Sequence, residues 1–144
     1  MRILYSVAGI VLLCDQLTKF LAVWFLKPIT GVPVVPNVFH LSFIENSGIA
    51  FGLFQGHPEF WTLIITASVL CLLIISPFFW TQSILRKLAF GFILGGAIGN
   101  WIDRLRFEHV IDFLDFRIWP VFNLADSFIT IGVFLFVLFA LRGR

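Results

Sequence analysis

The chain of 144 residues has the composition of a protein that lies in lipid, since 60% of its residues are hydrophobic, 12% are charged and the mean hydropathy is +1.02. Its formal net charge of +2 comes from Lys and Arg residues spread along the chain, so we expect no nucleic-acid partner. A carboxylate inside a membrane span costs at least about 2.5 kcal/mol, so the acids among these apolar segments are candidates for a functional role.

Four apolar stretches are each long enough to cross a bilayer as a helix of about 20 residues. They cover residues 3–26, 60–80, 85–105 and 120–141. We therefore expect an all-α membrane protein whose four transmembrane helices form a bundle, with residues 1–144 as one domain. Arg2, Arg86 and Lys87 lie at one side of this bundle, and the positive-inside rule makes that side, with both termini, cytoplasmic.

The first apolar stretch carries Asp15, Thr18 and Lys19 on one helix face, because these positions are spaced i, i+3, i+4. An Asp-Lys pair in a span is either a clamp between helices or part of a reacting site, and the sequence leaves both open. The stretch also resembles a cleavable signal peptide, but Leu13 before Cys14 and the lack of a small-residue cleavage site argue against removal.

The segment between the first two spans, residues 27–58, contains three prolines that prevent a regular helix. Residues 39–43 alternate between apolar and polar side chains, as a half-buried strand does, and residues 45–48 are turn formers that precede the apolar residues 49–54. The pattern predicts a small extracytoplasmic β-hairpin or β-cradle between the first and second helices, extending from Val34 to Phe54. A simple connecting loop is the alternative.

The third span has small residues every fourth position, at Gly91, Gly95 and Gly99, followed by Asp103. Such a stripe allows two membrane helices to approach closely. Asn100 and Arg104 lie beside the stripe. Arg104 either forms an ion pair with a nearby acid or holds a carbonyl or carboxylate group of a bound peptide with its forked guanidinium.

The fourth span has a polar stripe in its outer half, formed by Asn123, Asp126, Ser127 and Thr130, and Pro120 is expected in its first turn. Asp112 follows the third span near the same outer surface. The short connection between these helices predicts that Asp112 and Asp126 meet. Two adjacent carboxyl groups share a proton, and such a pair can activate water and protonate a carbonyl oxygen. Asp115 is a rival for a place in this pair.

Two other functions fit a membrane bundle with polar residues. A proton-coupled transporter would distribute its acids across the whole membrane depth, whereas the acids here gather in the outer half. A bundle that only assembles other membrane proteins would use the glycine stripe as its partner face and gives no reason for paired acids. The three His residues lie outside the spans and neither Cys belongs to a ligand-spaced motif, so we expect no metal or other cofactor.

The sequence resembles the lipoprotein signal peptidases, or signal peptidase II, which are aspartic endopeptidases of bacterial membranes. The matching segments, in chain order, are residues 15–19 (DQLTK), 46–52 (NSGIAFG), 95–104 (GGAIGNWIDR), 110–113 (VIDF) and 122–127 (FNLADS). They extend from the first span to the last, so the resemblance covers nearly the whole chain.

The resemblance implies roles for individual residues. Asp112 and Asp126 occupy the positions of the catalytic aspartates, which favours Asp112 over Asp115. The implied substrate-binding residues are Asn46, Gly48, Asn100, Arg104 and Asn123, and the implied site-supporting residues are Asp15, Lys19 and Asp103.

The resemblance also implies the reaction and the partners. The expected substrates are prolipoproteins whose lipobox Cys carries diacylglycerol, cut on the amino side of that Cys. Membrane lipid and globomycin-type inhibitors are the other expected partners, and we expect a monomer. The implied location is the bacterial cytoplasmic, or inner, membrane, with the active site near its outer face and the β-hairpin as a candidate lid.

Overall fold

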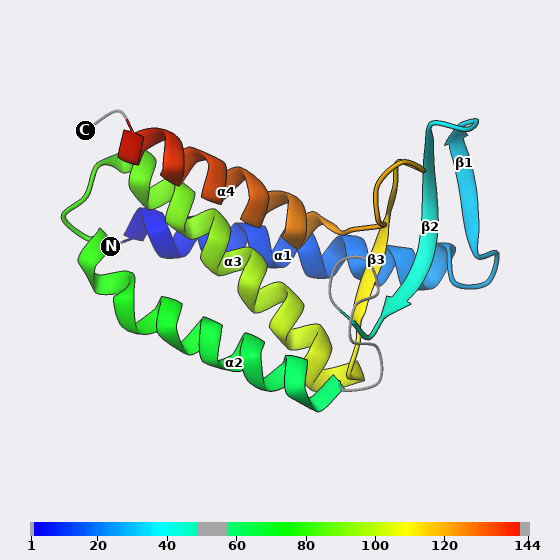
Figure 1. Ribbon diagram of the computed structural model, residues 1–144, viewed down its shortest axis with the longest axis horizontal. Coiled ribbons are helices and arrows are strands. Elements are labelled where there is room, and N and C mark those ends of the chain that lie inside the picture. Colours follow the sequence, from blue (N-terminus) through cyan, green and yellow to red (C-terminus); the bar gives the residue numbers. More distant parts are fainter. Residues whose placement is uncertain (1, 49–57, 142–144) are drawn as a thin grey trace.

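The computed structural model describes residues 2–48 and 58–141, which form a helical bundle with a small sheet at one end (Figure 1). The elements in chain order are α1 (Arg2–Phe25), β1 (Gly31–Val35), β2 (Phe39–Asn46), α2 (Pro58–Ile75), the 3-10 helix η2 (Ser76–Phe79), α3 (Ile84–Phe107), β3 (Val110–Asp115) and α4 (Leu124–Leu141).

The bundle is organised around α3, which packs against α1, α2 and α4. The start of α1 and the end of α4 lie at the same end of the bundle, and the sheet lies at the opposite end (Figure 1). The buried residues Leu4, Ala8, Phe90 and Leu94 form an apolar cluster between α1 and α3. The helices α1 and α4 thus start and end, respectively, at the same end of the bundle, and the side of the membrane on which that end lies remains a prediction.

The glycine stripe of α3 faces α1. A Cβ atom added at Gly95 would lie 2.5 Å from the carbonyl oxygen of Ala8, and one added at Gly99 would overlap the carboxylate of Asp15. The stripe is therefore covered by this chain's own first helix and is not free to serve as a face for another protein. The close approach of α1 and α3 also brings Asp15 next to the polar end of α3.

Two helical segments of the described residues are long and apolar enough to cross a membrane, Arg2–Phe25 and Glu59–Phe79. The segment Leu124–Phe139 is apolar but shorter, and α3 carries charged residues at both ends. The structure thus has the expected four helices, of which α1 and the segment formed by α2 and η2 are clear candidate spans. Four complete spans remain a prediction.

The sheet differs from the predicted hairpin. Its order is β1-β2-β3, all antiparallel, so the hairpin consists of Gly31–Val35 and Phe39–Asn46, and the third strand, Val110–Asp115, comes from the connection between α3 and α4. The turn lies at residues 36–38, where Asn37 adopts a φ of 60°, a conformation that Asn tolerates well. Glu45 and Asn46 belong to β2 and not to a turn, and residues 49–54, predicted as the returning strand, lie outside the described residues.

The start of α4 also differs from the prediction, because the helix begins at Leu124 and not near Pro120. Phe122 forms two backbone hydrogen bonds with Leu114, of 2.8 and 3.1 Å, and these keep residues 120–123 extended beside β3. Asn123 then caps the helix. Asp126 consequently lies in the first turn of α4 and not one or two turns below its start.

Candidate active site

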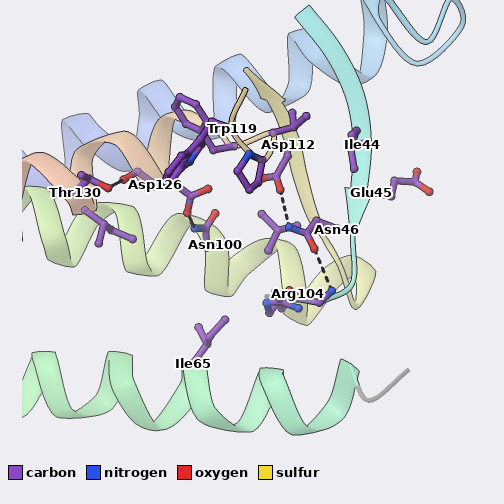
Figure 2. Close-up of a pocket in the computed structure, with 16 residues that line it drawn as sticks. Ile44, Glu45, Asn46, Ile65, Asn100, Arg104, Asp112, Trp119, Asp126 and Thr130 are labelled. Atoms are coloured by element: carbon purple, nitrogen blue, oxygen red, sulfur yellow. Dashed lines mark hydrogen bonds between the residues drawn. The ribbon is translucent and has the colours of Figure 1, made fainter. Parts of the chain in front are cut away.

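A cavity of about 550 Å³ lies where the sheet meets the helices. Figure 2 shows the side chains that line it converging from β2, β3, α2, α3 and α4. Its polar residues are Glu45, Asn46, Asn100, Arg104, Asp112, Asp126 and Thr130, and its apolar walls include Ile44, Ile65, Val110, Trp119, Val121 and Ile129. The structure thus places both aspartates of the expected pair in one cavity.

Asp112 lies in the middle of β3 and is 2% exposed. Its Oδ2 atom accepts a hydrogen bond from the amide of Asn46 at 2.8 Å, and its Oδ1 atom accepts one from the amide of Asn123 at 2.7 Å. Asn46 reaches Asp112 because β2 pairs Asn46 with Val110 and Ile44 with Asp112, which makes the two residues diagonal neighbours.

The pKa of Asp112 is raised to about 7. Burial is the largest cause, because a carboxylate loses the solvation of water, and the negative charge of Asp126 raises the pKa further. The hydrogen bonds from Asn46 and Asn123 favour the ionised form and oppose the increase. Asp112 therefore keeps its proton to a much higher pH than an exposed aspartate does, which suits a general acid.

Asp126 belongs to a capping box at the start of α4. The backbone N–H of Asp126 donates to Oδ1 of Asn123 at 2.9 Å, and the backbone N–H of Asn123 donates to Oδ2 of Asp126 at 3.3 Å. This reciprocal arrangement satisfies amide groups at the helix start. It also fixes the carboxylate of Asp126 at the helix N-terminus, where the helix dipole favours a negative charge.

Two asparagine side chains connect the aspartates. The amide nitrogen of Asn100 donates to Oδ1 of Asp126 at 2.8 Å, while the amide nitrogen of Asn123 donates to Asp112 and, at 3.1 Å, to the amide oxygen of Asn100. Asn123 is fully buried and Asn100 is 9% exposed. The two carboxyl groups are therefore held by one continuous set of hydrogen bonds.

Behind the aspartates lies a buried ion cluster formed by Asp15, Lys19 and Asp103, which we call the Lys19 triad. The ammonium of Lys19 is 2.9 Å from Oδ2 of Asp15 and 2.8 Å from Oδ2 of Asp103, and it donates to the amide oxygen of Asn100 at 2.8 Å. All three residues of the triad are at least 98% buried. Sequence spacing placed Asp15 and Lys19 on one face, and the structure adds that this face meets α3 beside the cavity.

Arg104 is 5% exposed and lines the cavity. One of its terminal nitrogens donates to the carbonyl oxygen of Gly48 at 2.7 Å, and no hydrogen-bond partner among the described residues is present for Nε and Nη1. The ion-pairing alternative is not what the described residues show, since the acids of the Lys19 triad pair with Lys19 instead. Among the described residues, these two donor atoms of Arg104 are therefore unused.

Asp115, the rival for the pair, does not line the cavity. Its carboxylate accepts hydrogen bonds from Ser42 at 2.9 Å and from the backbone and guanidinium of Arg117. Partial burial raises the pKa of Asp115, but these hydrogen bonds lower it by more, so the net pKa is below the usual value. Thr18 likewise bonds to backbone carbonyls of its own helix and takes no part in the triad.

Gln16 is a residue whose contribution was missed at the sequence level. Its amide nitrogen donates to Asp103 at 3.0 Å and to Asp15 and the carbonyl oxygen of Gly99 at 3.3 Å. Gln16 lies inside the matching segment of residues 15–19, so the sequence did contain a sign of its role. An uncharged amide next to Asp15 gives no further local indication. In the part of the chain that the structure describes, no cluster of His, Cys, Asp and Glu is placed to hold a metal ion.

Comparison with known proteins gives a consistent result. The family model of signal peptidase II matches residues 7–142. The lipoprotein signal peptidase of Halothermothrix orenii is 44% identical over 135 residues, which cover 94% of this chain and 92% of the relative, and that of Caldanaerobacter subterraneus is 44% identical over 130 residues, which cover 90% and 89%.

The fold also matches solved structures. A bacterial membrane enzyme solved at 2.3 Å superposes with a TM-score of 0.86 at 29% identity, covering 99% of this chain and 89% of that one. A second, solved at 1.9 Å, gives a TM-score of 0.84 at 28% identity and covers 100% and 96%. The matched residues include both cavity aspartates and the Lys19 triad, and the chain belongs to the signal peptidase II family.

Proposed function

We propose that the chain is an aspartic endopeptidase that removes signal peptides from prolipoproteins in the bacterial inner membrane. The scissile bond is the peptide bond on the amino side of a diacylglyceryl-modified Cys. The observation that carries the proposal is a pair of carboxyl groups in one cavity, both bonded to Asn123. The raised pKa of Asp112, about 7, suits a proton donor and supports the proposal. Family membership supports the peptidase activity and the class of substrate.

In the proposed reaction the two aspartates have different roles at the outset. Ionised Asp126 removes a proton from the attacking water, and protonated Asp112 donates its proton to the carbonyl oxygen of the scissile bond, which gives a tetrahedral intermediate. Asp126 then donates the acquired proton to the leaving nitrogen while Asp112 recovers a proton from the intermediate's hydroxyl group. Water is consumed, one carboxyl and one amine product leave, and the pair returns to its starting state.

The remaining cavity residues position the peptide. Arg104 offers Nε and Nη1 as donors to a backbone carbonyl oxygen of the substrate, because these atoms have no other partner among the described residues. The apolar walls at Ile65, Trp119 and Ile129 suit the apolar residues and acyl chains of a lipidated peptide. Acyl chains that stay in the bilayer also supply part of the positioning, because they hold the scissile bond near the interface.

The proposal is tested with purified protein in detergent and a diacylglyceryl-modified prolipoprotein. Asp112→Asn and Asp126→Asn should each lower the cleavage rate at least about 100-fold, because a carboxamide cannot exchange the proton at these steps. Asp115→Asn is the matched control, since it makes the same change in the same strand but outside the cavity, and should leave the rate within about threefold. Thermal unfolding and gel filtration check that each variant is folded.

Substantial cleavage by either Asp112→Asn or Asp126→Asn would exclude the aspartic pair. An equal loss in Asp115→Asn would show that the effect comes from charge at this end of the bundle and not from catalysis. Wild-type cleavage of the unmodified prolipoprotein at the same rate would refute the requirement for the lipidated Cys.

A further inference from the structure

We propose that Lys19 is a positioning residue of this peptidase, whose buried ammonium fixes the direction of the Asn100 and Asn123 amides and thereby aims their donors at Asp126 and Asp112. The proposal rests on the aspartic pair proposed above and adds a residue that touches neither the substrate nor the reacting atoms. It assigns the Lys19 triad a part in the chemistry and not only in the fold.

The Lys19 ammonium determines which way the amide group of Asn100 points. An ammonium has three donors and no acceptor, so the atom of Asn100 that faces Lys19 at 2.8 Å must be the amide oxygen. The amide nitrogen then faces the opposite way, where it donates to Asp126 at 2.8 Å. Without the ammonium, only the amide nitrogen of Asn123, at 3.1 Å, would still donate to this oxygen, so the direction of the Asn100 amide would be held less firmly.

The orientation of the Asn100 amide in turn affects the amide group of Asn123. The oxygen of Asn100, held by Lys19, also accepts a hydrogen bond from the amide nitrogen of Asn123 at 3.1 Å. That nitrogen therefore points toward Asp112, to which it donates at 2.7 Å, while the oxygen of Asn123 accepts from the backbone of Asp126. Lys19 thus fixes the direction of the Asn100 amide directly and, together with the backbone N–H of Asp126, supports the direction of the Asn123 amide.

The triad also holds the backbone next to each aspartate. Asp15 accepts a hydrogen bond from the N–H of Ala125 at 2.9 Å, and Asp103 accepts one from the N–H of Ile111 at 3.2 Å. Ala125 and Ile111 are the residues that directly precede Asp126 and Asp112. Lys19 bonds to both of these carboxylates, so it ties together the two backbone segments on which the aspartates lie.

The energetic cost of the triad supports a role beyond packing. A buried ion pair contributes little net stability compared with apolar residues of similar volume, because desolvation offsets the attraction. Lys19 is 2% exposed, and its three donors are directed to Asp15, Asp103 and Asn100, two acids and one residue that lines the cavity. A purely structural link between α1 and α3 would not require a donor-only group aimed at Asn100.

Lys19→Met alone would leave two buried carboxylates without a cation, so the test uses Asp15→Asn/Lys19→Met. In the folded wild-type protein the triad carries two acids and one base, and in this double variant only Asp103 remains, so the formal charge beside the aspartates is the same. Asp15→Asn alone is the control, since Asn at position 15 can still accept from Ala125 while Lys19 stays in place. Asp103→Asn and Asp103→Asn/Lys19→Met repeat the comparison from the other side of the triad.

We expect kcat of each double variant to be about 10- to 100-fold below that of its single-variant control, with KM within about threefold, because the aspartates are misaligned while the substrate contacts remain. The upper pH limb of kcat/KM should also lie at higher pH than in the wild type, whose triad carries the same formal charge as that of the double variants, since the pair loses aligned donors. The charged groups that face the pair are those of the triad, Arg104 and the cavity residue Glu45, and of these only Lys19 differs between a double variant and its control.

A folded double variant with the kcat and pH profile of its control would overturn the proposal, as would a loss confined to thermal stability. This outcome differs from failure of the proposed function, which would appear as activity in Asp112→Asn or Asp126→Asn. Lys87→Met, at the opposite end of the bundle, controls for the loss of a lysine and should change neither kcat nor the pH limb.

Discussion

Asp112 holds its proton because of burial, and this has consequences for both stability and activity. An Asp in an unfolded chain has a pKa of about 3.9, whereas burial raises the pKa of Asp112 to about 7. Between these pH values the folded chain binds a proton that the unfolded chain has released. The contribution of Asp112 to stability therefore falls as the pH rises from about 4 to about 7, and its activity as a proton donor is lost as the pH rises through about 7.

The hydrogen bond from Asn46 to Asp112 allows a direct test of the assignment of Asp112 as the proton donor. It favours the ionised form of Asp112, so Asn46→Ala should raise the pKa of Asp112 and move the upper limb of the kcat/KM profile to higher pH. Ser42→Ala is the matched control, because it removes a side-chain donor to a carboxyl group, that of Asp115, from the same strand. The measurement is a pH profile of lipoprotein cleavage.

Ser42→Ala should leave the limb in place. A limb that stays fixed or moves to lower pH in Asn46→Ala would contradict the assignment of the limb to Asp112.

The roles of the individual site residues could be predicted from the sequence only in part. Asp112 and Asp115 are an odd number of positions apart, so a strand directs them to opposite faces, but the residues around them were not predicted to form a strand. The pattern Asn123-x-x-Asp126 is a capping-box spacing, and it would have placed the helix start at Leu124 had Pro120 not suggested an earlier one. Hydrogen bonds such as that from Asn46 to Asp112 join distant parts of the chain and carry no local signal.

At the scale of elements, the helices and the hairpin could be predicted from the sequence, but the third strand of the sheet could not. Long apolar runs are an unambiguous signal, whereas β3 is buried on both faces and shows no alternation of apolar and polar residues. Its partner β2 is more than 60 positions away, as the bond between Asn46 and Asp112 shows. The prediction of a hairpin in residues 27–58 was correct in kind, but its strands are β1 and β2.

The packing of α3 on α1 predicts a difference between two glycines. A Cβ at Gly95 would lie 2.5 Å from the backbone oxygen of Ala8, while one at Gly9 would meet nothing within 4 Å. Gly95→Ala should lower the melting temperature by at least about 4 °C, and Gly9→Ala should leave it unchanged or raise it slightly, because Ala favours helix over Gly. Thermal unfolding in detergent measures both.

Equal melting temperatures for the two variants would show that α1 and α3 are not in close contact. Because the two substitutions are chemically identical and both lie in helices, helix propensity alone does not separate them.

At the scale of the whole molecule, the structure has a polar end, which holds the proposed active site, and an apolar body. The sheet lies at one end (Figure 1), together with the cavity, its wall residue Trp119 and the exposed Trp24 in the last turn of α1. The basic residues Arg86 and Lys87 lie at the other end, in the first turns of α3. Trp61, in the first turns of α2, is 8% exposed and packs inside the protein. We infer from the basic residues that the end with Thr81 faces the cytoplasm.

This orientation is tested with single cysteines in a background where Cys14 and Cys71 are replaced by Ala. Ile118→Cys lies at the catalytic end in a residue that is 94% exposed, and Thr81→Cys lies at the opposite end. In spheroplasts, a membrane-impermeant maleimide should label Ile118→Cys, and it should label Thr81→Cys only after lysis. The reverse pattern would place the active site on the cytoplasmic side, and the cysteine-free protein controls for background labelling.

The capping box at the start of α4 limits how this enzyme can escape an inhibitor. Asp126 carries out the proposed chemistry and Asn123 holds both aspartates, and the two residues also satisfy the first amides of the helix. A lost cap costs about 1 kcal/mol. A substitution there that weakens inhibitor binding therefore removes activity and helix stability together. Compounds that draw their affinity from these two residues leave few routes to resistance, whereas compounds that depend on the rim at Trp119 leave many.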